Sequence, residues 1–139
     1  MRVMAVDYGD ARIGVAVSDA SATLAGDAWV LNEKSAHEAA RTISAEATAR
    51  GVGVIVVGYP KNMNGTVGPR AEKSEQFADR IRSQCSINVV LWDERMTTLS
   101  ANRILTETGK FGKKRKKTVD AVAASLILES YLKSRECTL

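Results

Sequence analysis

Apolar residues along the chain recur first at the spacing of β-strands and later at the spacing of α-helices. By period two, Val3, Ala5 and Asp7 fall on one face of the first strand. Met4 and Val6 fall on the other face, and apolar residues on both faces indicate a doubly covered strand. Apolar positions repeated every three or four residues predict helices. Strands are predicted at residues 3–7, 13–18, 22–32, 53–58 and 87–92, and helices at 35–50, 70–84, 97–108 and 118–133.

Local signals mark where these elements end. Ser35 followed by Glu38 forms a capping-box pattern, and Gly51 is a typical helix stop. Thr118 is the expected cap of the last helix, which places the preceding basic residues in a loop. Residues 8–12 form a polar turn between the first two strands.

The order of the predicted elements is β-β-β-α-β-α-β-α-α. Strands joined by short turns pair antiparallel, and strands reached through a helix pair parallel to the first strand. The chain is therefore expected to form one α/β domain over residues 1–139. Its mixed five-stranded sheet has strands one to three antiparallel, strands four and five parallel to strand one, and helices on both faces.

Composition excludes several classes of protein. Hydrophobic residues make up 45% of the chain and charged residues 26%, as in ordinary globular proteins. No apolar run approaches the roughly 20 residues of a membrane span, and the N-terminus has no signal-peptide pattern. Cys85 and Cys137 lie far apart without metal-ligand spacing. These features predict a cytoplasmic protein with reduced thiols and no membrane partner.

The positive charge of the chain is concentrated in one segment. The formal net charge is +4, and six basic residues lie within positions 110–117: Lys110, Lys113, Lys114, Arg115, Lys116 and Lys117. The remaining 14 basic residues are outnumbered by 16 acidic ones. A concentrated basic segment favours a polyanionic partner, because neutralising phosphates releases counterions. A solvated basic loop without a partner is the alternative.

Acidic residues follow the predicted strands at positions that should share one edge of the sheet. Asp7 ends the first strand, Glu94 lies just after the fifth with Asp93 before it, and Asp120 opens the last helix. Ligands of such sheets bind beyond the carboxyl ends of the parallel strands. Gathered carboxylates suit Mg²⁺ or Mn²⁺, and two such ions can promote hydrolysis of a phosphodiester. Individually, each acid could instead cap a turn, pair with Arg95 or face a helix dipole.

Four blocks of the sequence resemble those of the YqgF family, also called RuvX. They occur in order and span nearly the whole chain: Asp7-Tyr8-Gly9 with residues 12–19, then residues 57–66, 93–98 and 120–132. The resemblance implies an RNase H-like fold related to the RuvC resolvases and a nuclease activity. For bacterial members it implies maturation of the 5′ end of the 16S ribosomal RNA precursor, and an older assignment is Holliday-junction resolution.

The resemblance places the family's catalytic, metal-binding acids on Asp7, Glu94 and Asp120, with two Mg²⁺ or Mn²⁺ ions when substrate is bound. Strand spacing makes it difficult for Asp7 and Glu94 to meet. If strand five lies two strands from strand one, the two positions begin roughly 10 Å apart. Period two also sends Asp93 and Glu94 to opposite faces, and periodicity alone does not choose between them. The family pattern favours Glu94.

Several polar residues near this edge are candidate contacts to nucleic acid: Arg12, Lys61, Asn64, Arg95 and the basic residues of positions 110–117. Arg12 could bind a phosphate or hold Asp7. Tyr59 and Lys61 stand where many relatives have aliphatic residues, and Lys61 adds a possible phosphate contact. Asn64 belongs to a polar loop, for which ordinary turn chemistry is the alternative.

The expected partner is structured RNA, with branched DNA as the alternative, and ribosomal precursor particles are the expected context. The acids do not separate the two nucleic acids, since the phosphodiester step is the same. The first turn also resembles the phosphate hairpin of actin-like ATPases, and a non-catalytic nucleic-acid-binding module is a further alternative. The chain is expected to be a monomer or a weak homodimer.

Overall fold

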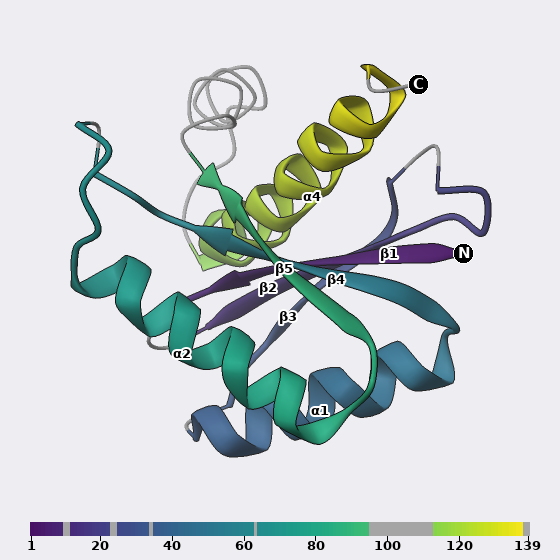
Figure 1. Cartoon of the computed structure of the whole chain (residues 1–139), viewed down its shortest axis with the longest axis horizontal. Coiled ribbons are helices and arrows are strands. Elements are labelled where there is room, and N and C mark those ends of the chain that lie inside the picture. Colours follow the sequence, from purple (N-terminus) through teal and green to yellow (C-terminus); the bar gives the residue numbers. More distant parts are fainter. Residues whose placement is uncertain (10–11, 23–24, 34, 63, 95–112, 138–139) are drawn as a thin grey trace.

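The computed structural model describes residues 1–9, 12–22, 25–33, 35–62, 64–94 and 113–137 (Figure 1). The elements in chain order are β1 (Arg2–Tyr8), β2 (Ile13–Ser18), β3 (Ala25–Leu31), α1 (Ala36–Ala49), β4 (Val52–Tyr59), α2 (Pro69–Gln84), β5 (Asn88–Asp93) and α4 (Lys113–Cys137). The helix predicted over residues 97–108 lies outside the described residues.

The five strands form one sheet in the order β3-β2-β1-β4-β5. β1 pairs antiparallel with β2, and β2 pairs antiparallel with β3. β4 lies parallel to β1 on its other side and parallel to β5. The predicted mixed sheet is confirmed, and the carboxyl ends of β1, β4 and β5 lie at one edge. That edge is called the rim below.

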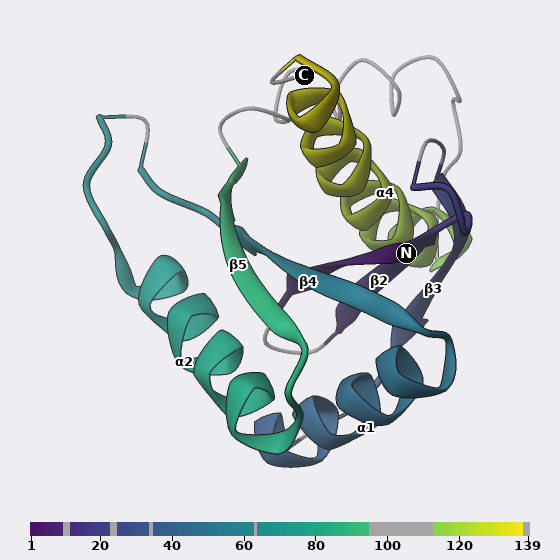
Figure 2. The same cartoon turned by 45° about the vertical axis from the view of Figure 1, so that its right-hand side comes forward.

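Helices cover both faces of the sheet, with α1 and α2 on one side and α4 on the other (Figure 2). Side chains alternate between two buried clusters, as period two requires. Met4 and Val6 of β1 belong to the cluster under α1 and α2. Val3 and Ala5 belong to the cluster under α4, together with Ile127 of that helix. The alternation read from the sequence therefore assigns each β1 side chain to its observed layer.

Most element boundaries agree with the sequence signals to within one or two residues. The Ser35 hydroxyl accepts a hydrogen bond from the Glu38 amide at 3.3 Å, which confirms the predicted cap of α1. Gly51 follows α1 with a φ of +71°, a conformation that glycine adopts without strain. β3 begins at Ala25 rather than at residue 22, because a turn comes first. In that turn the Ala22 amide donates to the Asp19 carbonyl at 3.1 Å.

The prediction that Thr118 caps the last helix is wrong. α4 begins at Lys113, so positions 113–117 belong to its first turns and not to a loop. Lysine and arginine are good helix formers, and their long side chains lose little rotamer freedom in a helix. Nothing in the run itself therefore ends the helix, and the cap signal at Thr118 is overridden.

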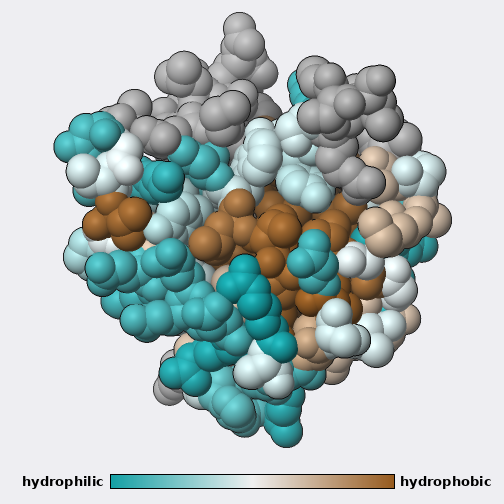
Figure 3. Space-filling view, viewed as in Figure 1, coloured by the Kyte–Doolittle hydropathy of each residue, from teal (hydrophilic) through white to brown (hydrophobic). Residues whose placement is uncertain are grey.

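The surface on the side seen in Figure 1 is unevenly apolar. Figure 3 shows apolar side chains gathered in the middle of this face, where Figure 1 places β5 and α4, and polar ones over α2. The described helices include none with the length and apolarity of a membrane span. Cys85 is a half-buried free thiol.

Candidate active site

Asp7 lies at the rim, where β1 runs out. Its neighbour in the antiparallel ladder is Gly14 of β2. Asp7 continues the alternation of Val3 and Ala5, so it lies on the face of the sheet that α4 covers. The residue is half-buried, which places a carboxylate at the border between the core and solvent.

Glu94 reaches Asp7 although β4 lies between their strands. A hydrogen bond joins the two side chains, so the sequence-based separation of about 10 Å between strand positions is bridged. Trp92 lies in the cluster under α4, and Glu94, two residues later, reaches the same face. Of the two adjacent acids, Glu94 is therefore the one that meets Asp7.

Gly58 of β4 makes this crossing possible. A β-carbon at position 58 would lie 2.9 Å from Cδ of Glu94 and 2.8 Å from Cδ1 of Ile127. Both distances are shorter than van der Waals contact allows. The missing side chain thus leaves the space through which Glu94 passes from β5 toward β1, beneath Ile127 of α4.

The environment of Glu94 favours its protonated form. Burial raises the pKa of Glu94 to about 8, and the negative charge of Asp7, the hydrogen bond to Asp7 and the charge of Asp93 act in the same direction. The positive charge of Arg70 opposes them. Two carboxyl groups therefore share a half-buried site in which a proton, or a cation in its place, relieves their repulsion.

The third predicted acid, Asp120, is placed only by its backbone. Position 120 lies in α4, four residues before Ala124, which is buried against the sheet. Residues four apart lie on the same face of a helix. The Asp120 side chain is outside the described part, and the described residues alone contain no group of three or more candidate metal ligands.

Of the predicted nucleic-acid contacts, the structure describes the side chains of Arg12, Lys61 and Asn64. Arg12 directly precedes β2 on the same edge as Asp7. The Asn64 side chain accepts hydrogen bonds from the amide and the hydroxyl of Thr66, at 3.1 and 2.7 Å, so it stabilises its own loop. Arg95 and Lys110 lie outside the described residues. The backbones of Lys113, Lys114, Arg115, Lys116 and Lys117 lie in α4, and their side chains are not described.

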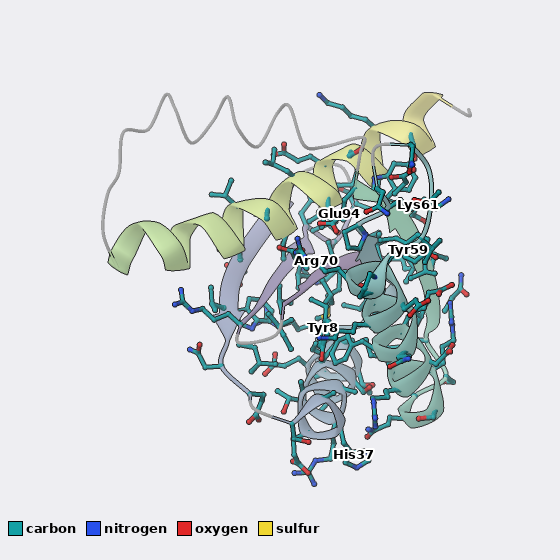
Figure 4. All side chains as sticks on the ribbon, turned by 90° about the vertical axis from the view of Figure 1, so that its left-hand side faces the viewer. Tyr8, His37, Tyr59, Lys61, Arg70 and Glu94 are labelled. Carbon is teal, nitrogen blue, oxygen red and sulfur yellow. The ribbon has the colours of Figure 1, made fainter. Side chains whose placement is uncertain are left out.

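Lys61 is held near the rim by Tyr59. Its ammonium nitrogen lies 5.6 Å from the centre of the Tyr59 ring. The Tyr59 hydroxyl is hydrogen-bonded to Glu75 of α2, and burial together with the charges of Glu75 and Glu72 raises the pKa of Tyr59. Tyr59 thus connects the end of β4 to α2, and Lys61 lies beside the Tyr59 ring (Figure 4).

Arg70 is a residue of this site that the sequence analysis did not single out. It lies in the first turn of α2, and Figure 4 shows it beside Glu94. The available signal was topological, because a helix that follows a parallel strand begins at the ligand-binding edge of the sheet. His37, by contrast, is exposed on α1 and lies at the far end of the molecule from Glu94 (Figure 4).

Trp92 packs within the protein. Its indole nitrogen donates to the Ser130 hydroxyl at 3.2 Å, and its ring meets Tyr131 edge to face at 5.6 Å. Trp29 lies under the guanidinium of Arg50, at 4.6 Å from the ring centre.

Known proteins resemble this chain over nearly its whole length. A family model described as "RuvX: Holliday junction resolvase" matches residues 1–134. A protein of Geobacillus thermodenitrificans named "Putative pre-16S rRNA nuclease" is 45% identical over 137 residues, covering 97% of this chain and 99% of that protein. A protein of the same name from Caldanaerobacter subterraneus is also 45% identical over 137 residues, covering 98% and 99%.

Solved structures share the fold at low sequence identity. Thermus thermophilus RuvC in complex with a Holliday junction substrate superimposes with a TM-score of 0.57 at 13% identity, covering 96% of each chain. The fowlpox virus resolvase bound to Holliday junction DNA gives a TM-score of 0.60 at 14% identity, covering 97% of this chain and 99% of that one. The chain thus has the RNase H-like fold of these resolvases.

Proposed function

Because the chain belongs to the RuvX family, we propose that it is a divalent-metal-dependent nuclease that matures the 5′ end of the 16S ribosomal RNA precursor. The chain is a nuclease by its family and by its relatives. The metal requirement, the RNA substrate and the residues that act are the parts that we propose. A cytoplasmic location and an association with ribosomal precursor particles accompany this substrate.

The observation that supports the proposal most directly is the meeting of Asp7 and Glu94 across Gly58. A structural role would not require two carboxyl groups to share a half-buried position, since each repels the other when ionised. A site for a divalent cation does require it. Carboxylate oxygens are also the ligands that Mg²⁺ and Mn²⁺ prefer.

Asp7 and Glu94, together with Asp120 from α4, are the proposed metal ligands. Divalent cations bound there supply Lewis acidity for hydrolysis of a phosphodiester. The chain contributes the geometry: Gly58 leaves room for Glu94, and Ile127 of α4 lies against the same position. Binding of a divalent cation would require Glu94 to release its proton. Both Asp7 and Glu94 would then be available as carboxylate ligands.

Holliday-junction resolution is the second candidate, favoured by the description of the family itself. The two substrates differ in shape and in the 2′-hydroxyl, and not in the bond that is cut. The acids of the rim therefore serve either reaction, and only a comparison of substrates separates them.

The test compares cleavage of a 16S precursor RNA and of a four-way DNA junction, each in Mg²⁺ and in Mn²⁺. We expect metal-dependent cleavage of the RNA by the wild-type protein and at least a hundredfold loss in Asp7→Asn, because that variant removes one ligand charge. Asp79→Asn is the matched control, since Asp79 is an exposed acid of α2 paired with Arg82 at 2.7 Å. Undiminished cleavage by Asp7→Asn would refute the assignment, and preference for the junction would select the second candidate.

A further inference from the structure

Arg70 is a positively charged group fixed at the rim. α2 follows β4 and begins at Pro69, so its first turn lies beside the carboxyl ends of the parallel strands. Figure 4 shows Arg70 beside Glu94, and its charge acts on that carboxyl group. The residue comes from the α2 side of the sheet, opposite the helix that covers the acids.

The backbone of Arg70 is held firmly in place. The next residue, Ala71, is fully buried, and Ser74 one turn later is buried as well. Further along α2, the Phe77 ring stacks on Tyr8, the last residue of β1, with 4.3 Å between ring centres. α2 is thus fixed to the strand that carries Asp7, and the position of Arg70 relative to the acids is set by packing.

The guanidinium of Arg70 is available for a ligand. The side chain is exposed, and the described residues provide it with neither a hydrogen bond nor an ion pair. Arg41, Arg50 and Arg82 differ in this respect, because each pairs with a carboxylate within reach. The guanidinium of Arg70 carries five N–H donors, and its charge acts on Glu94.

A nuclease of this design must bring a polyanion to a cluster of carboxylates. Carboxylates repel phosphate when they are ionised, and a cation of the chain at the same place offsets that repulsion. Planar guanidinium groups bind two oxygens of one phosphate at once. We propose that Arg70 binds the non-bridging oxygens of the phosphate that is cut or of its immediate neighbour, an inference that rests on the proposed nuclease function.

A different role for Arg70 makes different predictions. If Arg70 only tuned the charge of Glu94, its loss would change metal binding and the pH profile of cleavage, and would leave affinity for nucleic acid unchanged. If Arg70 binds phosphate, its loss weakens nucleic-acid binding and removes one phosphate contact from the salt dependence.

The experiment measures binding of fluorescently labelled 16S precursor RNA by anisotropy, at several salt concentrations in Mg²⁺. The proteins carry Asp7→Asn so that the RNA stays intact. Adding Arg70→Ala should weaken binding about tenfold or more, because a hydrogen-bonded charged contact is lost, and should reduce the salt slope by about one. Adding Arg70→Lys should keep the slope and recover part of the affinity, because a lysine retains the charge but not the planar fork.

Arg80→Ala is the matched control, since Arg80 is an exposed arginine farther along the same helix. It should change neither the affinity nor the slope. Equal affinity and equal slope for Arg70→Ala and Arg80→Ala would overturn the inference. Cleavage assays keep the two proposals separate: if the wild type cleaves and Asp7→Asn does not, the nuclease assignment stands whatever Arg70 does.

Discussion

At the scale of single residues, Gly58 decides whether Glu94 and Asp7 can meet. The two atoms that a β-carbon would strike, Cδ of Glu94 and Cδ1 of Ile127, are the ends of flexible side chains and can move aside. A substitution at this position therefore displaces the acid and leaves the backbone of β4 where it is. On the proposed function, Gly58 is a functional position although it carries no functional group.

Gly58→Ala is expected to lower the cleavage rate at least tenfold while costing only about 1 kcal/mol of folding free energy, the low end for an overpacked core site. The measurements are kcat on the precursor RNA and the free energy of unfolding in urea. Gly53→Ala is the control, because Gly53 lies on the same strand and its β-carbon would strike only the side chain of Met1. Full activity in Gly58→Ala would mean that cleavage does not depend on the space that Gly58 leaves for Glu94.

At the scale of the elements, α4 combines a buried apolar face with a basic amino end. Ala124, Ile127 and Leu128 bury one face of the helix against the sheet. The same helix starts with five consecutive basic residues, 113–117. Positive charges at the amino end of a helix are unfavourable, because that end of the helix dipole is itself positive. A polyanion bound there would therefore stabilise α4.

Replacing Lys113, Lys114, Arg115, Lys116 and Lys117 by glutamine should weaken binding of RNA and flatten its dependence on salt. Glutamine is a good helix former, so α4 is expected to persist, and circular dichroism can verify this. Each phosphate contact that is lost should lower the salt slope by roughly 0.7–0.9. Lys133→Gln, at the other end of α4, serves as the control. An unchanged slope in the multiple variant would show that these charges do not meet the substrate.

At the scale of the whole molecule, Glu94 connects folding stability to pH and, on the proposed function, to metal. The pKa of Glu94 is about 8 in the folded protein and ordinarily 4.5. Between these values the metal-free folded state holds a proton that the unfolded state has released. Stability is therefore fully present below about pH 4.5 and falls as pH rises toward 8.

In EDTA, the free energy of unfolding of the wild type should fall by a few kcal/mol between pH 5 and pH 8, since one pKa unit corresponds to about 1.4 kcal/mol. Glu94→Gln should remove much of this fall, and Glu129→Gln, an exposed acid of α4, should not. Adding Mn²⁺ at pH 8 should stabilise the wild type and release a proton. Stability independent of pH, with no effect of Mn²⁺, would contradict a shared cation site.

Much of the fold follows from local chemistry. Period two assigned the β1 side chains to their layers, and the Ser35 cap and Gly51 stop fixed the ends of α1. Short connections and helical crossovers determined which strands pair antiparallel and which parallel. The start of α4 escaped prediction, because helix propensity in the basic run outweighed the cap signal at Thr118.

The sequence by itself determined the order of the described elements and the layers of the core, since both depend on neighbours along the chain. Only the tertiary structure decided that Glu94 and not Asp93 meets Asp7, and that Arg70 lies beside them. Both outcomes depend on strand twist, on the space left by Gly58 and on where α2 begins relative to the rim. Contacts between distant segments of this kind are set by packing and leave no periodic signal in the sequence.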